Sequence, residues 1–433
     1  MRFVKDILNL RNYTLLWLGQ SVSILGSSMT GFAITIWAFE RTGNALTLSI
    51  SGLLIMVPKM LGGILAGPFV DRFNKKTIIL FSDLGSGLCT LTLFLLLKAN
   101  SLEIWHIYCL NFISSILGSF QSPANNVVVS QIVPKEYYIK ANGMQSFSNG
   151  TIQILSPIFA ATMLGVTGIL GVIAFDFATL IIACLTLICF VEIPFISNKK
   201  PNKFSFISYL SELRSGFSVI LDSSLLSKLL LLMAFINLVA GITYFNLISP
   251  MILSRSGNDS NALALVNGAL GLGGIIGGLL STFIPTTKSK IKTMFLCVGL
   301  SFLLGDILFA VGNSKPIWVI AGFLSSVFIP IFSANESYFW RTIIPIELQG
   351  RAFSFKYALQ SGMVPIGMLL GGILADYFFE PFMLNVSNPL TLVVGSGKGS
   401  GMAVMFLLTG VTGTILSVLG LVSRTLLESE KGL

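Results

Sequence analysis

Long apolar runs dominate this chain and restrict it to structures that a lipid bilayer accepts. Hydrophobic residues make up 54% of the 433 residues and charged residues only 10%. About 20 apolar residues cross a hydrocarbon core as a helix, and helices and closed barrels alone satisfy their backbone hydrogen bonds there. The sequence therefore predicts an all-α integral membrane protein. We expect twelve transmembrane helices, near residues 14–38, 46–70, 78–98, 104–126, 141–165, 169–191, 228–253, 261–284, 293–312, 316–340, 352–378 and 401–424.

An internal repeat divides these spans into two related sets. The segment LGGILAG at 61–67 recurs as LGGIIGG at 272–278, and PKE at 134–136 recurs as PIE at 345–347, both at an offset of 211 positions. Two related halves in a membrane protein are typical of transporters whose substrate site lies near the bilayer midplane. We expect two pseudo-symmetric six-helix halves at 1–191 and 228–433, joined by a linker at 192–227.

Positive charge falls mostly on one side of the predicted spans. Of the 27 Lys and Arg residues, 21 lie on one side, in the loops or near the span ends, five lie on the other side, and Lys59 lies deep inside a span. Cytoplasmic loops are enriched in Lys and Arg, so we expect both termini and the linker in the cytoplasm of a bacterial cell, with the chain in its inner membrane. Helical spacing of apolar residues at 206–221 predicts an amphipathic linker helix on the membrane surface. No nucleic-acid partner is needed to explain the net charge of +9.

The loop after the second predicted span carries a motif that resembles a known family. Residues 67–76 read GPFVDRFNKK, similar to the signature loop of the major facilitator superfamily, in which Asp-Arg is followed by Gly and two basic residues. Asn74 stands at the place of that Gly, and we expect it to keep the turn by adopting a left-handed backbone. The resemblance implies a latch that holds the two halves together on the cytoplasmic side and favours the outward-open state. Its residues would be Gly67, Asp71, Arg72, Lys75 and Lys76.

Further motifs narrow this resemblance. Ser122-Pro123-Ala124, the segment 133–136 and Ala141-Asn142-Gly143 resemble the branch that contains macrolide-efflux proteins and related bacterial drug and siderophore exporters. The resemblance covers nearly the whole chain. It implies efflux of amphiphilic drug-like compounds, macrolide-type antibiotics first and siderophores second, by proton antiport with rocking alternating access. Ser114 departs from the pattern, because many proton-coupled drug exporters carry an Arg there.

Ionisable residues inside the spans are the candidates for proton coupling. Charged groups are costly in hydrocarbon, and burial can move the titration of a carboxylate toward neutral pH. Asp83, Asp176, Asp306 and Glu336 are the candidate acids, and we expect Asp176 and Asp306 to be the main proton carriers. For each acid the alternative is a permanent pairing or a helix cap. Lys59, near the middle of the second span, needs a partner or a water-filled cavity.

Polar side chains on several spans predict a polar-walled central cavity. Ser114 and Ser115 in the fourth span recur as Ser325 and Ser326 in the tenth, so we expect both stripes to face this cavity. Packing between helices is the alternative use of such residues. A cavity acid would attract a cationic substrate and a cavity lysine an anionic one, and both remain open. The candidate substrate contacts are Gln20, Lys59, Gln121, Asn125, Gln145, Tyr244, Glu336 and Gln360.

Enzymatic motifs are missing from the sequence. The glycine-rich segment 394–401 lacks the Ser or Thr that follows Lys in a phosphate loop, and no nucleophile, base and orienting group occur together. We expect no enzymatic activity, no cofactor and no metal, and a monomer whose partners are a small-molecule substrate, protons and membrane lipids. Two other functions stay open: flipping of lipids or lysolipids, and a non-transporting membrane sensor or scaffold.

Overall fold

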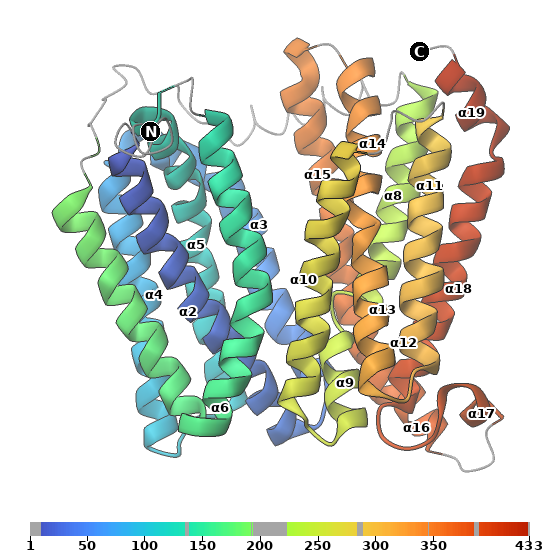
Figure 1. The fold of residues 1–433 in the computed structure, drawn as a ribbon, viewed down its shortest axis with the longest axis horizontal. Helices are drawn as coiled ribbons and strands as arrows, with labels where there is room; N and C mark the ends of the chain where they lie inside the picture. The colour runs from blue at the N-terminus through green and yellow to red at the C-terminus, as the bar shows by residue number, and fades with distance from the viewer. Residues whose placement is uncertain are drawn as a thin grey trace. The chain divides into compact units, whose positions relative to one another are not determined.

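The computed structural model describes residues 10–134, 138–191, 193, 223–283, 289–344, 346–384 and 389–431, in which every regular element is helical (Figure 1). This confirms the all-α membrane fold. Ten helical stretches are long and apolar enough to cross a membrane, and one of them, Phe147–Phe190, covers parts of two predicted spans. The predicted linker helix at 206–221 lies outside the described residues.

The chain divides into two compact units. Unit 1 comprises Met1–Ala38 and Ile50–Lys203, and unit 2 comprises Phe39–Ser49 and Phe204–Leu433. The short segment Phe39–Ser49, where the first two long helices meet, therefore belongs with the second unit. The regular elements of the first repeat are α2 (Arg11–Thr42), α3 (Ala45–Arg72), α4 (Lys75–Lys98), α5 (Ile104–Ile132) and α6 (Tyr138–Phe190).

Gly168 breaks α6 into two helices, as the sequence predicts from the gap between the fifth and sixth spans. Its backbone has φ 70° and ψ −177°, a conformation that L side chains rarely adopt. The chain thus reverses direction at Gly168 without a longer loop. Pro157 lies inside the first of these two helices.

The second repeat is cut into shorter pieces than the sequence predicts. Several spans here consist of two or three consecutive helices separated by turns or by π-helical segments. In a π-helical segment each backbone hydrogen bond spans one residue more than in an α-helix. Its elements are α8 (Ser224–Ile242), α9 (Ile248–Ser256), α10 (Ser260–Phe283), α11 (Lys290–Ser301), η2 (Phe302–Asp306), α12 (Ile307–Val311), α13 (Lys315–Val327), α14 (Ile329–Ile343), α15 (Ile346–Leu374), η3 (Ala375–Phe379), α16 (Glu380–Met383), α17 (Thr391–Val394), α18 (Ser400–Val422) and α19 (Arg424–Lys431), where η2 and η3 are the π-helical segments.

The prediction of one continuous helix at 228–253 is wrong. Residues 243–247 form a turn between α8 and α9, in which the backbone N–H groups of Asn246 and Leu247 both donate to the carbonyl oxygen of Thr243. Such irregular backbone at membrane depth is tolerated where it is buried in protein or lines a cavity. Thr243, Asn246 and Leu247 are all buried, so this break is enclosed by the unit.

Close backbone contact fixes α8 against α15. A Cβ atom added at Gly241 would lie 2.6 Å from the carbonyl oxygen of Val364, and one added at Gly367 would lie 2.9 Å from the Cα of Gly241. Small residues at helix crossings let two membrane helices approach closely. The end of α8 nearest to the break is therefore held firmly by its neighbour.

The serine stripes serve packing between helices, which corrects the expectation that they face a central cavity. Ser115 of α5 donates to the carbonyl oxygen of Ile55 in α3. Ser326 of α13 is 4% exposed, and its hydroxyl leaves no room for a side chain at Gly273 of α10. In the first repeat a serine of α5, Ser119, leaves no room for a side chain at Gly62 of α3, so in both repeats a serine of one helix packs against a glycine of the other.

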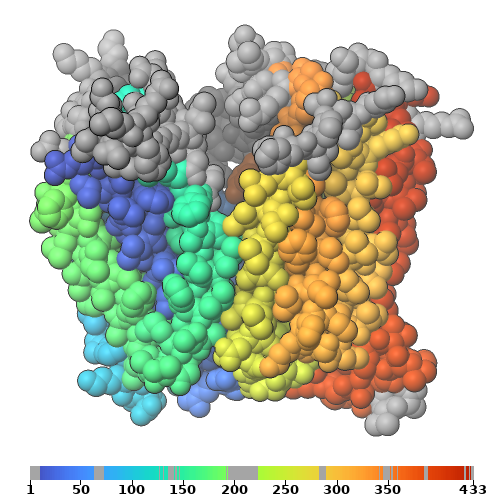
Figure 2. Space-filling view, viewed as in Figure 1, coloured from blue at the N-terminus to red at the C-terminus, as the bar shows by residue number. Residues whose placement is uncertain are grey.

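Large apolar side chains are exposed on the helices of unit 2, as expected of a surface that faces lipid. Figure 2 shows α10 and α13 forming part of one such face. A bilayer, unlike water, imposes no cost on these side chains. On α10 and α13 they include Leu265, Leu272, Ile275, Ile276, Leu279, Leu280, Ile317 and Ile320.

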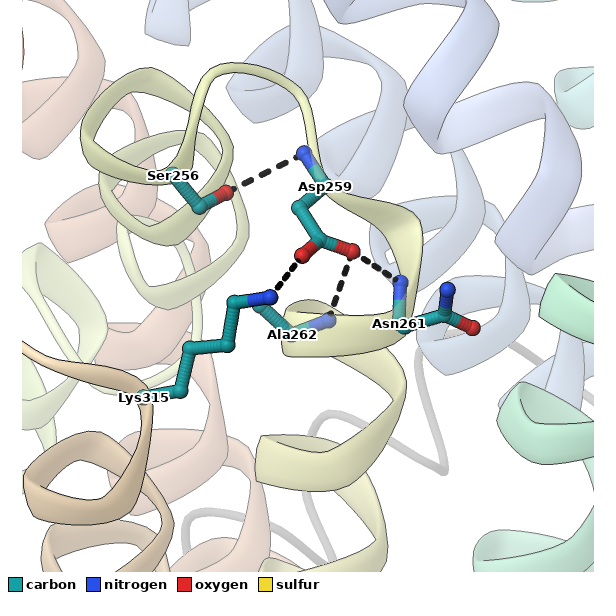
Figure 3. Close-up of polar contacts among 5 residues, drawn as sticks. All are labelled: Ser256, Asp259, Asn261, Ala262 and Lys315. Atoms are coloured by element: carbon teal, nitrogen blue, oxygen red, sulfur yellow. Dashed lines mark hydrogen bonds and ion pairs between the residues drawn. The ribbon is translucent and has the colours of Figure 1, made fainter.

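Acidic side chains cap three helices whose first N–H groups lack partners within the helix. Asp259 accepts from the N–H groups of Asn261 and Ala262 at the start of α10 and pairs with Lys315, as Figure 3 shows. Glu430 of α19 accepts from the N–H of Lys290 at 2.5 Å and so caps α11. Asp376 of η3 accepts from Ala45 at 3.0 Å and from Leu46 at 2.7 Å, all within unit 2.

Candidate functional site

A buried polar cluster in unit 1 joins three helices around Asp83. The amide of Gln20 on α2 donates to one carboxylate oxygen at 3.0 Å, and the amide of Gln121 on α5 donates to the other at 2.5 Å. Gln121 also donates to the side-chain oxygen of Gln20 at 3.2 Å. Three residues that the sequence marked separately, two as substrate contacts and one as a proton carrier, therefore form one network. Asp83 itself is 5% exposed.

Asp176 lies in a second buried position of unit 1. The hydroxyl of Ser27 on α2 donates to its carboxylate at 2.9 Å and that of Thr90 on α4 at 3.4 Å. A Cβ atom added at Gly26 would lie 2.9 Å from the Cα of Asp176, so α2 and the second part of α6 are in close contact here. Hydroxyl groups alone thus solvate this carboxylate, which is 3% exposed.

Asp306 occupies the corresponding kind of position in unit 2. It ends the π-helical segment η2 and is 2% exposed. The hydroxyl of Thr409 on α18 donates to its Oδ2 at 2.9 Å, and that of Thr243, at the break after α8, donates to the same oxygen at 3.2 Å. π-helical segments within α-helices frequently occur at functional sites. The π-helical segment therefore marks Asp306 independently of its charge.

Glu336 differs from the three aspartates because a cation neutralises it. Lys356 of α15 lies 2.9 Å from its Oε1, and Gln360 donates to the same oxygen at 3.1 Å. The ammonium group of Lys356 also lies 4.9 Å from the ring centroid of Trp340. Lys356 is one of the 21 basic residues on the side expected to be cytoplasmic, and its pairing with Glu336 does not follow from the sequence.

Among the remaining cavity candidates, no hydrogen bond or ion pair joins Lys59, Gln145 or Asn125 to these clusters in the described part of the chain, whereas Tyr244 interacts electrostatically with Asp306. Lys59 on α3 is exposed. Gln145 on α6 is exposed too, and its amide donates to Asn149 at 3.1 Å. Asn125 on α5 keeps its side-chain oxygen buried, and no hydrogen-bond partner for that oxygen occurs among the described residues. Tyr244 is half-buried in the turn after α8, next to Thr243.

The predicted latch loop is described only in part. Gly67, Asp71 and Arg72 end α3, and the positions of their side chains fall outside what the structure describes. Asn74 has φ −63° and accepts from the backbone N–H of Lys76 at 2.9 Å, so the expectation of a left-handed backbone is wrong. Asn74 caps α4 instead, a role that Asn fills as well as any residue.

The second lysine after Asn74 contacts the end of another helix. Lys76 donates to the carbonyl oxygens of Ile188 at 3.2 Å and Val191 at 2.8 Å, at the end of α6. A cation there is favoured because a helix C-terminus carries partial negative charge. Lys75 is 6% exposed. The basic end of the motif therefore fastens α4 to α6 within unit 1.

The arrangement separates two kinds of buried acid. Asp83, Asp176 and Asp306 are held by amide and hydroxyl donors, which stabilise a carboxylate less than a neighbouring cation does. Glu336 has Lys356 at ion-pair distance, so its carboxylate is matched by a positive charge. Carboxylates of the first kind can take up and release a proton as their surroundings change. Among the described residues, no group of three or more His, Cys, Asp or Glu side chains could hold a metal ion.

Sequence reasoning missed the groups that hold the acids in unit 2. Thr243, Thr409 and Lys356 were not singled out, and neither was Asn246, which donates to the carbonyl oxygen of Met368 at 2.8 Å. The one local signal was Pro250, which has no N–H to donate and often lies in the first turn of a helix. It indicates a new helix start within the predicted seventh span.

Membrane-spanning helices with an apolar exterior and hydrogen-bonded acids buried inside define a polytopic membrane transporter. The family model of the Major Facilitator Superfamily matches residues 16–305. The chain therefore belongs to the major facilitator superfamily, as the signature loop indicates.

Individual proteins resemble this chain over most of its length. The chain is 28% identical over 375 residues to a macrolide efflux protein A of Streptococcus pyogenes, covering 85% of this chain and 90% of that protein. It is 24% identical over 379 residues to the multidrug efflux pump Tap of Mycolicibacterium fortuitum, covering 83% and 90%. A bacterial homologue of the iron transporter ferroportin in its inward-facing state shares the fold, with TM-score 0.66, 13% identity, and coverage of 94% and 99%.

Proposed function

We propose that the chain is a proton-coupled exporter of amphiphilic drug-like compounds, with macrolide-type antibiotics as the first substrate class. Similarity to a macrolide efflux protein and to a multidrug pump supports the substrate class and the outward direction. The imbalance of Lys and Arg supports a bacterial inner-membrane protein with both termini in the cytoplasm. Alternating access of the two halves would move the substrate.

The observation that carries proton coupling is that three carboxylates are buried in the spans and that, among the described residues, the donors that bind them are neutral. Asp306 and Asp176 are the preferred carriers, because hydroxyl groups alone bind them. Asp83 comes third, because each of its two carboxylate oxygens accepts a hydrogen bond from an amide group, and these bonds favour the carboxylate over its protonated form. The ion pair with Lys356 disfavours Glu336 as a carrier and as a contact for a cationic substrate.

The test is transport by purified protein in lipid vesicles under a pH gradient of either direction. The panel contains a macrolide, a cationic dye and a catecholate siderophore, and the variants are Asp176→Asn and Asp306→Asn. Asp259→Asn is the matched control, because Asp259 pairs with Lys315 at a helix end rather than inside a span. We expect gradient-driven macrolide movement in the wild type and the control, and its loss in at least one of the two variants.

Other outcomes would replace this proposal. Full gradient-driven transport in both variants would exclude Asp176 and Asp306 as the proton carriers. If nothing in the panel moves, the same vesicles with headgroup-labelled lipids test lipid flipping, the alternative within transport. Transfer of labelled lipid between leaflets would support that function, and no movement of any kind would favour a sensor or scaffold.

A further inference from the structure

Asp306 is connected to the break in the seventh span by a single hydroxyl group. Thr243 follows α8 directly, and its Oγ1 lies 3.2 Å from Oδ2 of Asp306 and 3.0 Å from Oγ1 of Thr409. Its carbonyl oxygen accepts from the N–H of Leu247 at 2.7 Å, which closes the turn. One residue therefore binds the buried acid with its side chain and the turn with its backbone.

The two threonines around Asp306 differ in what they can bind. Thr409 lies on α18, and its hydroxyl is also within 3.0 Å of the carbonyl oxygen of Met405 in the same helix. It can return to that intrahelical bond if Asp306 stops accepting. Thr243 lies outside a helix, and its hydroxyl contacts in the structure are Asp306 and Thr409. A change in the charge of Asp306 therefore affects Thr243 more than Thr409.

The turn carries side chains that reach different surroundings. Tyr244 is half-buried and interacts electrostatically with Asp306. Phe245 is 53% exposed, whereas Asn246 is fixed by Met368. The two ends of the broken span are held separately, α8 by its glycine contact with α15 and α9 by Arg255, which donates to the carbonyl oxygen of Ala310 at 3.3 Å. Between these two held ends, Tyr244 and Phe245 are the less buried residues of the turn, whereas Thr243, Asn246 and Leu247 are buried.

We propose that Thr243 and Thr409 are positioning residues for Asp306. In this proposal Thr243 also transmits the protonation state of Asp306 to the turn 243–247, and so to Tyr244. This inference rests on the proposed proton coupling. A charged carboxylate accepts from both hydroxyls and holds Thr243 in place. A protonated one is a weaker acceptor and donates a proton of its own, so Thr243 loses its charge-assisted bond. The turn then loosens and Tyr244 changes position.

Few other titratable groups influence this site. Among the described residues, Tyr244 is the ionisable neighbour on the turn side. The helices packed against η2 are α11, α12, α13 and α18, of which α12 and α18 contain no acid or base. Lys290, Lys292 and Lys315 lie at the first turns of α11 and α13, and Cys297 is the remaining titratable side chain of α11.

The experiment is a pH titration of the purified protein by infrared difference spectroscopy, reading the carboxyl band that Asp306→Asn removes. Thr243→Val and Thr409→Val remove one hydroxyl each at similar volume, whereas Thr243→Ser keeps it. Hydrogen bonds to a charged carboxylate favour that form, so the midpoint should rise by about one pH unit in Thr243→Val and return toward the wild-type value in Thr243→Ser. Thr414→Val is the control, because Thr414 bonds Gly410 within α18.

Hydrogen exchange of the peptide that covers 243–247 is the second readout. It should be faster in Asp306→Asn and in Thr243→Val than in the wild type, and unchanged in Thr414→Val. An unchanged midpoint in Thr243→Val and Thr409→Val, equal shifts in the control, or no band lost in Asp306→Asn would overturn the inference. These readouts need no substrate, so a wild type that titrates as expected but transports nothing along a proton gradient contradicts the proposed function alone.

Discussion

Glu336 and Lys356 form an ion pair inside the second unit, with 2.9 Å between Oε1 and Nζ and side-chain exposures of 9% and 17%. The two residues come from α14 and α15 and hold these helices together through a contact that Gln360 extends. Charges that are mostly withdrawn from water depend on each other, because either one alone would be left without compensation.

Removing one member of this pair should therefore destabilise the protein more than removing both. We expect Lys356→Met to lower the free energy of unfolding by up to about 3–5 kcal/mol, the usual cost of breaking a buried pair. The double variant Glu336→Gln/Lys356→Met should regain a large part of this loss. Thermal unfolding in detergent measures both effects. A double variant as unstable as the sum of its single changes would show that the two side chains act independently.

The cluster around Asp83 should depend strongly on Gln121. Gln121→Leu removes the donor at 2.5 Å from Oδ1 and leaves a buried carboxylate oxygen without a partner, which costs about 1–3 kcal/mol. Gln145→Leu is the matched control, since Gln145 is exposed and bonds an exposed neighbour. The unfolding midpoint of the control should stay near that of the wild type. Equal effects of the two substitutions would contradict the role assigned to the cluster.

The carboxylate of Asp376 should stabilise the start of α3. It accepts from two N–H groups there, and loss of a capping side chain costs about 1 kcal/mol. We expect Asp376→Ala to lower the unfolding midpoint clearly, and Asp376→Asn, which keeps an acceptor without the charge, to lower it less. Tyr377→Phe changes an adjacent side chain that is 67% exposed and should have little effect.

The pair of Asp259 and Lys315 predicts a pH dependence of stability in the acid range. The hydrogen bond from Lys315 is the main cause that lowers the pKa of Asp259, with N–H groups of α10 contributing. A lowered pKa in the folded state gives stability that is present above the unfolded value of about 3.9 and is lost as the pH falls through the folded value.

Lys315→Met should therefore destabilise the protein at neutral pH and lose this effect in acid. The difference should be small, below about 1 kcal/mol, because the pair is partly exposed. Unfolding midpoints of both proteins between neutral pH and pH about 3 would show it. A difference that grew as the pH fell would mean that Lys315 acts by some other route.

Helix positions and one helix break could be predicted because they depend on local sequence. Apolar runs give the spans, and Gly168 lies between two such runs and breaks the helix as expected. The turn at 243–247 could not be predicted in this way, because its residues read as a continuation of an apolar helix. Its first residue, Thr243, contacts Asp306, 63 positions away, and no local pattern shows such a contact.

The candidate site shows the same division. Polarity within a span identified Gln20, Asp83 and Gln121, but only the packing of α2, α4 and α5 shows that they share one network. The position of Lys356 is already explained by the enrichment of basic residues in cytoplasmic loops, so the sequence gives no reason to expect its ion pair with Glu336. Asn74 was assigned the backbone of the Gly it replaces, whereas the chain uses its side chain as a cap.

The cap that Glu430 places on α11 has a consequence for biosynthesis. Residues near 290 leave the ribosome well before residue 430 is made, so the first N–H groups of α11 await their acceptor while the chain between them is synthesised. The cap therefore joins two parts of the chain that are made at different times. A tag inserted close to Glu430 would interfere with this contact, whereas a tag separated from Glu430 by a flexible spacer would leave it intact.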